Sequence, residues 1–245
     1  MKRIFDFVLA GIGLIVASPF LLVVMYLIWR QDRHSPFYIA ARVGRGERTF
    51  MMVKLRSMIK NADRSGVDST SKDDQRITAV GKFVRQYKLD EIVQLWNVLK
   101  GDMSLVGPRP NVKRETDLYT REEKRLLSMR PGITDFASIV FSDEGEILAG
   151  KTDPDIAYNQ LIRPGKSQLG IFYVDHAKLA VDIRLIWLTL VAIVSKRDAL
   201  NGVVNLLRKL GAPSDLIDIA RRDKPLIPMA PPGCDEIVTS RQTTN

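Results

Sequence analysis

An uninterrupted apolar run opens the chain, because no residue from Phe7 to Trp29 is charged. A helix needs about 20 such residues to cross the hydrocarbon of a bilayer. Ser18 and Pro19 stand in the middle of the run, and a proline there removes a helix hydrogen bond and bends the helix. Each half is then about a dozen residues, or roughly 18 Å long, which is shorter than the roughly 30 Å of hydrocarbon.

The charges on the two sides of this run have the same sign. Lys2 and Arg3 precede it, and Arg30 and Arg33 follow it. The positive-inside bias therefore keeps both ends on the cytoplasmic side. Together with the central proline, these flanks predict a re-entrant membrane segment over residues 1–33 that enters one leaflet, bends at the Ser-Pro pair and returns. A kinked single span is the alternative, because kinked spanning helices are common.

Alternation of apolar and polar residues begins after this segment. The stretch from Phe37 to Met58 predicts two strands joined at Gly44–Gly46, and a polar loop, "NADRSGVDSTSKDDQ", follows. Lys54 and Arg56 share one face of the second strand. Two cations on one strand face can bind a phosphate, although a solvated face is the commoner explanation.

Helical spacing replaces the alternation further along the chain. Apolar residues recur every three or four positions from Val80 to Tyr87 and from Leu89 to Leu99, with Gly101 as a stop. Asp90 and Glu91 fall in the first turn of the second helix, where acidic side chains ordinarily cap the helix or compensate its dipole. The same position suits a carboxylate that has to stay ionised for chemistry.

Arg109 lies between two prolines in the sequence "GPRP". Pro108 and Pro110 fix the backbone on either side, so the guanidinium can be held out at a low entropic cost. Such a planar fork suits a diphosphate or a nucleotide. An extended surface turn with an unused arginine is the alternative interpretation.

The C-terminal third contains one more amphipathic helix. Its uncharged part, Leu185 to Val194, is too short to span a bilayer and suits a membrane interface or a core. Short helices and a largely disordered tail are expected over residues 197–245. The predicted fold class is α+β, with a mainly helical cytoplasmic domain over residues 34–196 that carries a small β-hairpin.

Composition narrows the chemistry. The formal net charge of +9 predicts anionic partners such as phosphates, anionic lipid or nucleic acid. His34 and His176 have no metal-ligand spacing, and two histidines give little support to a zinc or Ser-His-Asp site. The single cysteine, Cys234, excludes an intrachain disulfide and fits a reducing compartment. Nucleic acid is disfavoured as a partner, because the cations are dispersed and no binding-module motif appears.

The order of these pieces resembles the bacterial sugar transferase family, the small monotopic phosphoglycosyl transferases. The resemblance rests on "KRIFD" before an apolar segment broken at "SP", and on "RVGRGERTFMMVKLRSM", "GKFVRQYKLDEIVQLWNVLKGDMSLVGPRP" and "RPGIT". It covers residues 1–196 and is most specific from Gly81 to Pro110. Asp90 matches the family's nucleophile, and Glu91 matches its partner carboxylate.

The resemblance implies transfer of a sugar 1-phosphate from a nucleotide diphosphate sugar, usually a UDP-sugar, to undecaprenyl phosphate at the cytoplasmic face of the bacterial inner membrane. Asp90 would attack the β-phosphorus, release UMP and carry a covalent phosphosugar. Glu91 would assist the second half-reaction or help to order the metal, because Mg²⁺ is implied at Asp90. The expected substrate-binding residues are Lys54, Arg56, Arg85, Pro108, Arg109 and Pro110.

One region departs from the family pattern. Many relatives continue the "PGIT" turn with Gly-Trp, whereas this chain has Asp135-Phe136 followed by "ASIVFSDEGEILAG". The departure leaves the identity of the sugar open, and formation of a homodimer is open as well. The rival interpretation is a non-enzymatic basic scaffold docked to anionic lipid, which would require neither Asp90 nor magnesium.

Overall fold

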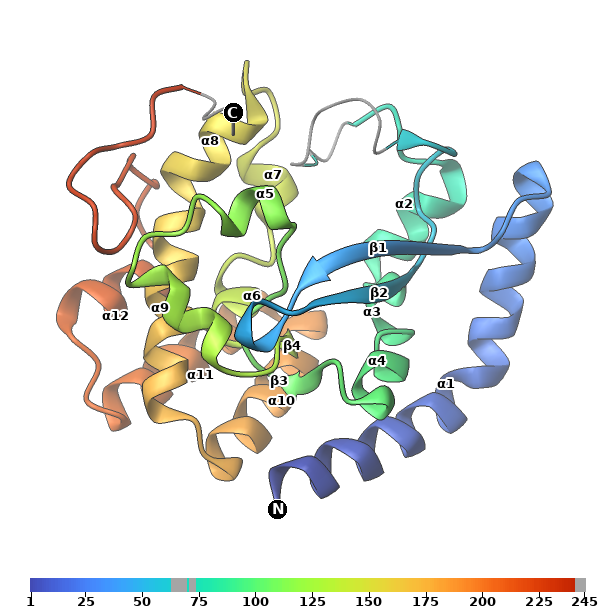
Figure 1. Ribbon diagram of the computed structural model, residues 1–245, viewed down its shortest axis with the longest axis horizontal. Coiled ribbons are helices and arrows are strands. Elements are labelled where there is room, and N and C mark those ends of the chain that lie inside the picture. The colour runs from blue at the N-terminus through green and yellow to red at the C-terminus, as the bar shows by residue number, and fades with distance from the viewer. Residues whose placement is uncertain (63–69, 71–73, 241–245) are drawn as a thin grey trace.

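The computed structural model describes residues 1–62, 70 and 74–240, so most of the expected polar loop and the last five residues lie outside it. The described chain is mainly helical and carries two small sheets (Figure 1). Its strands are β1 (Phe37–Val43), β2 (Thr49–Leu55), β3 (Ser104–Val106) and β4 (Gly132–Thr134). Its helices are α1 (Lys2–Asp32), η1 (Arg45–Glu47), α2 (Ala79–Gln86), α3 (Leu89–Ile92), α4 (Leu95–Lys100), α5 (Lys113–Thr116), η3 (Glu123–Ser128), α6 (Phe136–Val140), α7 (Glu144–Ile147), α8 (Pro154–Leu161), α9 (Arg163–His176), α10 (Leu179–Val194), α11 (Lys196–Lys209) and α12 (Ser214–Arg221).

The N-terminal helix α1 is continuous but bent. Pro19 lies inside it, near its middle, and Figure 1 shows two arms of the helix running in different directions. The Ser18 hydroxyl donates to the Ile15 carbonyl over 2.8 Å. The expected break at the Ser-Pro pair is therefore a bend within one helix, because a proline removes only one hydrogen bond of the ladder.

Helix α1 is long and apolar enough to cross a membrane, judged by length and composition alone. Only 17% of its most apolar window is buried inside the protein. The buried face packs on the domain through Ala10, Leu21, Val24 and Ile28. The other large apolar side chains face outward, among them Phe7, Ile12, Ile15, Val16, Phe20, Leu22, Val23 and Tyr26.

The first turn of α1 is tied to the globular domain. The Lys2 ammonium donates to Asp182 Oδ2 over 2.5 Å and to the carbonyl of Val106 over 3.1 Å. The Arg3 guanidinium donates to the carbonyl of Val98 in α4 over 2.5 Å. The basic residues that flank the apolar run therefore also fix where the helix begins.

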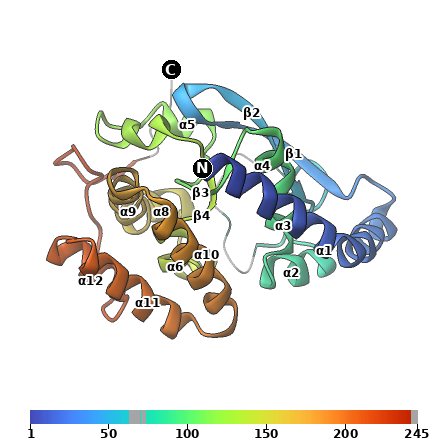
Figure 2. The same cartoon turned by 90° about the horizontal axis from the view of Figure 1, so that it is seen from below.

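The last turn of α1 is tied to the same domain. Arg56, which follows β2, donates to both carboxylate oxygens of Asp32 over 2.5 and 2.7 Å. Such a two-point pair is more geometrically restrictive than a single contact. Figure 2 shows α1 running alongside α3 and α4, so the helix lies on the domain rather than projecting from it.

The expected hairpin is confirmed. Strands β1 and β2 are antiparallel, with Ala41 opposite Met51, and the turn between them uses Gly46 at φ 65°. Its two faces pack against different parts of the protein. Leu55 is buried with the apolar face of α1, whereas Met52 joins the main core. The hairpin thereby joins α1 to the rest of the domain.

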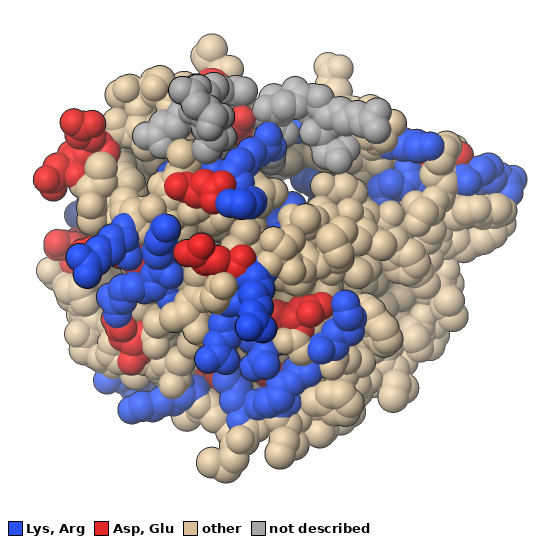
Figure 3. All heavy atoms as spheres, viewed as in Figure 1, with Lys and Arg blue, Asp and Glu red and all other residues tan. Residues whose placement is uncertain are grey.

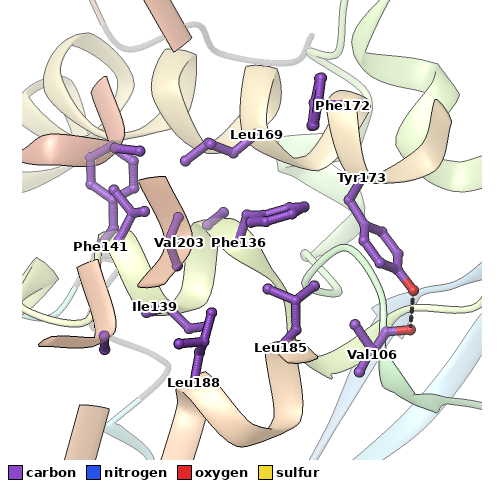
Figure 4. Packing of buried hydrophobic residues seen from close by; sticks show 14 of the residues in the cluster. Val106, Phe136, Ile139, Phe141, Leu169, Phe172, Tyr173, Leu185, Leu188 and Val203 are labelled. Atoms are coloured by element: carbon purple, nitrogen blue, oxygen red, sulfur yellow. Dashed lines mark hydrogen bonds between the residues drawn. The ribbon is translucent and has the colours of Figure 1, made fainter. Parts of the chain in front are cut away.

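The main core lies between α6, α9, α10 and α11. Figure 4 shows Phe136 of α6 between Leu169 of α9 and Leu185 of α10, with Val203 of α11 beside them. The Tyr173 hydroxyl donates to the Val106 carbonyl over 3.2 Å, which ties β3 to this core.

The core continues past residue 196 into the C-terminal extension. Val203 and Leu207 of α11 and Ala220 of α12 are fully buried. The described tail, residues 222–240, forms no helix or strand, yet it contacts the domain: the Met229 amide donates to the Gln160 carbonyl over 3.0 Å. The extension is thus part of the packed unit.

Candidate active site

The carboxylates Asp90 and Glu91 lie in the first turn of the short helix α3. Lys88, just before it, adopts the left-handed conformation with φ 52°, which turns the chain sharply between α2 and α3. Leu89 is buried against the α1 side of the hairpin and anchors the new helix. The sharp turn and this anchor fix where the two carboxylates stand.

Asp90 faces the hairpin. The Lys54 ammonium on β2 lies 3.9 Å from Asp90 Oδ2, and the two side chains are 20% and 15% exposed. Burial raises the pKa of Asp90, while the charges of Lys54, Arg85 and Arg109 oppose that shift. Asp90 makes no side-chain hydrogen bond within the described residues, so its oxygens are available to a ligand.

Glu91 is held differently. Arg109 Nη2 donates to Glu91 Oε1 over 2.6 Å. Burial works against ionisation of Glu91, but the positive charge of Arg109, with Lys54 and Lys88, lowers its pKa to about 2. Within this carboxylate dyad, Glu91 is therefore held as an anion by a hydrogen-bonded ion pair, whereas Asp90 has only the longer contact with Lys54.

Two of the three arginines expected at the site, Arg85 and Arg56, have different partners in the structure. Arg85 donates from Nε to the Ser57 hydroxyl over 2.9 Å, and its charge acts on Asp90. Arg56 is taken up by Asp32 and so serves the end of α1. Strand alternation does not carry Arg56 into the site, because β2 ends at Leu55.

The "GPRP" and "RPGIT" motifs form one structural unit. Strands β3 and β4 pair in parallel, the Gly107 amide donates to the Thr134 carbonyl, and the Gly132 amide donates to the Pro108 carbonyl, each over 3.0 Å. A Cβ at Gly132 would lie 2.0 Å from the Gly107 nitrogen, so only glycine permits this approach. The unit holds Arg109 against Glu91 on α3.

A cavity opens from Arg109 toward α8 and α9. Pro110 is buried and is not part of its wall, whereas Pro108 and Arg109 are. The lining residues are Pro108, Arg109, Asn111, Tyr119, Leu126, Asp135, Ala137, Ser138, Tyr158, Arg163, Lys166, Ser167 and Gly170.

Several charged residues near the dyad were missed by sequence reasoning. Arg42 lies on β1, where alternation and register place it on the same hairpin face as Lys54. Lys166 in the first turn of α9 lines the cavity and pairs with Glu144 of α7. The strand register could have revealed Arg42, but no local pattern predicts a contact between Lys166 and Glu144. Figure 3 shows many basic side chains, with acidic ones among them, on the face of the molecule that it presents.

The donor set can be tested against magnesium. The described residues hold no group of three or more Asp, Glu, His or Cys side chains that could bind a metal. Magnesium is commonly held by one or two carboxylates together with substrate phosphates and water. The unbound oxygens of Asp90 fit that mode, whereas Glu91 is already engaged by Arg109.

Comparison with known proteins decides the family. The model described as "Bacterial sugar transferase" matches residues 1–196. The chain belongs to the bacterial sugar transferase family. This confirms the resemblance seen in the motifs, its extent along the chain and the assignment to the sugar transferases.

Proteins with named functions align with much of this chain. A UDP-N-acetylgalactosamine-undecaprenyl-phosphate N-acetylgalactosaminephosphotransferase of Aeromonas hydrophila is 32% identical over 198 residues, 80% of this chain and 44% of its own length. The exopolysaccharide production protein ExoY of Sinorhizobium fredii is 33% identical over 211 residues, 80% of this chain and 86% of its own length. An undecaprenyl-phosphate galactose phosphotransferase of Salmonella typhimurium is 41% identical over 149 residues, 55% of this chain and 31% of its own length. The chain thus spans less than half of the Aeromonas and Salmonella relatives.

The family match ends at the first residue of α11, yet the structure links the two sides of that boundary. Lys196 and Arg222 both bind Asp143 Oδ2, over 2.5 and 3.0 Å. Asp143 precedes α7, the helix that begins with Glu144. The extension is therefore bound to the segment that leads into α7.

Proposed function

We propose that the protein transfers a sugar 1-phosphate from a UDP-sugar to undecaprenyl phosphate through a covalent aspartyl phosphosugar, the initiating step of a surface glycan. The names of the Aeromonas and Salmonella relatives include both undecaprenyl phosphate and a sugar, which supports this reaction class. The observation that carries the proposal is the unequal dyad. Asp90 is unbound beside Lys54, and Glu91 is fixed by Arg109.

In the first half-reaction, a carboxylate oxygen of Asp90 bonds to the β-phosphorus of the UDP-sugar. The bond from that phosphorus to the oxygen bridging the two phosphorus atoms breaks, and UMP leaves with that oxygen and its electron pair. The phosphosugar stays on Asp90 as an acyl phosphate, which is reactive enough to be passed on. Lys54, Arg85 and Arg109 supply positive charge where the phosphoryl group develops negative charge.

Magnesium is part of this proposal, with Asp90 as its protein ligand. When bound, Mg²⁺ would lower the repulsion between the Asp90 carboxylate and the anionic diphosphate. The protein contributes to the same task through the Lys54 ammonium, 3.9 Å from Asp90.

In the second half-reaction, a phosphate oxygen of undecaprenyl phosphate bonds to the phosphorus held on Asp90. The bond to the Asp90 oxygen breaks and the free carboxylate returns. Glu91 stays ionised under the influence of Arg109. Its role in this proposal is to assist the second half-reaction by helping to orient the acceptor. The products are UMP and a lipid diphosphate sugar.

The lipid acceptor requires the site to lie at the membrane, and we assign α1 a re-entrant topology at the cytoplasmic face of the inner membrane. Both ends of α1 are tied to one domain, through Lys2–Asp182 and Asp32–Arg56, while most of the apolar surface between them faces outward. A straight span would place the two ends on opposite sides of the bilayer and break one of these ion pairs.

Topology can be measured with single cysteines after Cys234→Ser. One cysteine is placed in a short extension before Met1 and another at the exposed His34. A membrane-impermeant thiol reagent should spare both in intact cells and label both once the inner membrane is opened. Labelling of one site alone from outside would show that α1 spans the bilayer.

The covalent intermediate provides the direct test of the reaction. Wild-type protein, Asp90→Asn and the surface control Asp117→Asn are incubated with a donor labelled in its sugar, without acceptor. The wild type and the control should retain label that chases into lipid when undecaprenyl phosphate is added, and Asp90→Asn should retain none. Equal labelling of all three proteins would remove Asp90 from the role of nucleophile.

A further inference from the structure

The wall of the cavity beside the dyad has no unpaired cation among its lining residues. All three cationic side chains in that wall are paired with carboxylates: Arg109 with Glu91, Arg163 with Glu123, and Lys166 with Glu144. The remaining polar members are largely amide and hydroxyl groups, from Asn111, Tyr119, Ser138, Tyr158 and Ser167, and one further acid, Asp135. A wall of this kind can donate to and accept from hydroxyl groups, but it has no free cation for a carboxylate.

The pair of Lys166 and Glu144 has the exposure expected of a binding contact. Their side chains are 15% and 33% exposed, so the pair is accessible but partly desolvated. The Lys166 ammonium also lies 5.3 Å from the centre of the Tyr158 ring. An ammonium and a carboxylate side by side can serve neighbouring hydroxyl groups as donor and acceptor.

The position of the Glu144–Lys166 pair relative to Asp90 and Glu91 indicates which part of a donor would contact the pair. The cavity extends from Arg109, which binds Glu91, to Lys166 in α9. When the β-phosphorus of a UDP-sugar lies at Asp90, one of the two groups attached to it, the sugar or the nucleotide, therefore lies within the cavity. The names of the Aeromonas and Salmonella relatives give different sugars but the same acceptor, undecaprenyl phosphate. The wall offers hydrogen-bond donors and acceptors and no free cation, so it fits the hydroxyl-rich group that varies between these names, the sugar.

We infer that the Glu144–Lys166 pair lines the subsite for the donor's sugar and selects an uncharged, hydroxylated sugar over one that carries a carboxylate. This inference rests on the proposed function. A uronate would bring an anion beside Glu144 and Asp135, with each wall cation already matched. An uncharged sugar adds no negative charge to a wall without an unpaired cation, and its hydroxyl groups can share the hydrogen bonds of the pair.

The C-terminal extension makes Arg222 a positioning residue for this subsite. Arg222 Nη2 binds Asp143 over 3.0 Å, and its guanidinium lies 5.1 Å from the centre of the Phe141 ring. Lys196 binds the same carboxylate over 2.5 Å. These contacts hold the residue that precedes α7, and α7 begins with Glu144.

Binding of two donors that share one nucleotide tests the inference. UDP-galactose and UDP-galacturonic acid differ only in the oxidation state of carbon 6. Their dissociation constants are measured by calorimetry on the full chain in detergent with Asp90→Asn, which prevents turnover. The protein with no further change should bind UDP-galactose at least about tenfold more tightly, the scale of one charged contact in a partly buried site.

Replacing the two members of the pair one at a time should shift the preference for UDP-galactose over UDP-galacturonic acid in opposite directions. Glu144→Gln leaves Lys166 unmatched, so the preference for UDP-galactose should fall by about tenfold. Lys166→Met leaves Glu144 unmatched, so the preference should rise, and the double variant should lie close to the unmodified pair. Arg222→Met should move the preference part of the way toward that of Glu144→Gln, with Arg222→Lys restoring it. Asp117→Asn, which breaks the exposed Lys113–Asp117 pair, is the matched control and should change nothing.

Three results would overturn the inference. The preference could stay fixed in both single variants, or both variants could weaken the two donors equally, as a contact with the shared nucleotide would require. UDP-galacturonic acid could also be the tighter ligand before any change at Glu144. None of these results bears on covalent labelling of Asp90, so failure of the subsite and failure of the proposed reaction are distinguishable.

Discussion

Glu123 and Asp90 are two poorly exposed carboxylates with opposite surroundings. Glu123 is fully buried and accepts hydrogen bonds from Arg163 (3.0 and 2.6 Å), from the Ser167 hydroxyl (2.7 Å) and from the Thr120 amide (3.1 Å). The Asp90 side chain is 15% exposed, and its only ionic partner among the described residues is the Lys54 ammonium, 3.9 Å away.

The difference separates a structural charge from a reactive one. Every donor around Glu123 is satisfied by it, so the carboxylate joins η3 to α9 and has no oxygen to spare. The charges around Asp90 keep an ionised form accessible without covering it. A nucleophile needs this second arrangement, since a carboxylate held by several hydrogen bonds must lose them before it can attack.

Replacing the two carboxylates one at a time should therefore have opposite effects on stability. Glu123→Gln leaves the buried Arg163 guanidinium without its counter-charge, and loss of one partner of a buried pair costs about 3 kcal/mol or more. Asp90→Asn should unfold at the same or a higher denaturant concentration than the wild type. Burial raises the pKa of Asp90 above its ordinary value, so ionisation of this group works against folding.

The effect of Asp90→Asn on stability should depend on pH, because the pKa of Asp90 is raised in the folded protein. The native state with a raised Asp90 pKa binds more protons than the unfolded state, so its stability falls as the pH rises through that window. The gain from Asp90→Asn should be full above the raised pKa and vanish below the ordinary aspartate range. Urea titrations of both variants at neutral and acidic pH check this. A loss of stability in Asp90→Asn as large as that in Glu123→Gln would contradict the distinction.

Much of the reactive side of this comparison could be predicted from local sequence. Helical spacing placed Asp90 in the first turn of α3, and alternation placed Lys54 in the hairpin whose face reaches it. Both signals extend over a few residues. The two prolines around Arg109 likewise predict a fixed arginine. Arg109 and its partner Glu91 are only 18 residues apart in sequence.

The ion pairs that hold the fold together could not be predicted from local sequence. Arg56 was expected near the substrate, but its partner Asp32 is 24 residues earlier, at the end of α1. Lys2 was interpreted as a membrane flank, and its partner Asp182 is 180 residues away in α10. Contacts at such separations depend on how the elements pack, which neither periodicity nor charge counting encodes.

The smallest expected effect concerns the charge that keeps Asp90 reactive. Lys54 favours the ionised form of Asp90, so Lys54→Met should raise the Asp90 pKa further. Formation of the covalent intermediate requires the carboxylate, and its rate should fall as the pH drops through that pKa. The acid limb of the rate profile should therefore move to higher pH in Lys54→Met. The rate on the plateau should fall by about tenfold or more, because a cation facing the phosphoryl group is lost.

Lys54→Arg is the matched control, since it keeps the charge and should leave the acid limb in place. Single-turnover labelling from pH 4 to pH 8, without acceptor, isolates the first half-reaction from release of the lipid product. A profile that drops uniformly in Lys54→Met, with an unmoved acid limb, would mean that Lys54 binds the donor without tuning Asp90. A moved limb in Lys54→Met alone ties the pH dependence to the pair, because Glu91, whose pKa is about 2, stays ionised across this range.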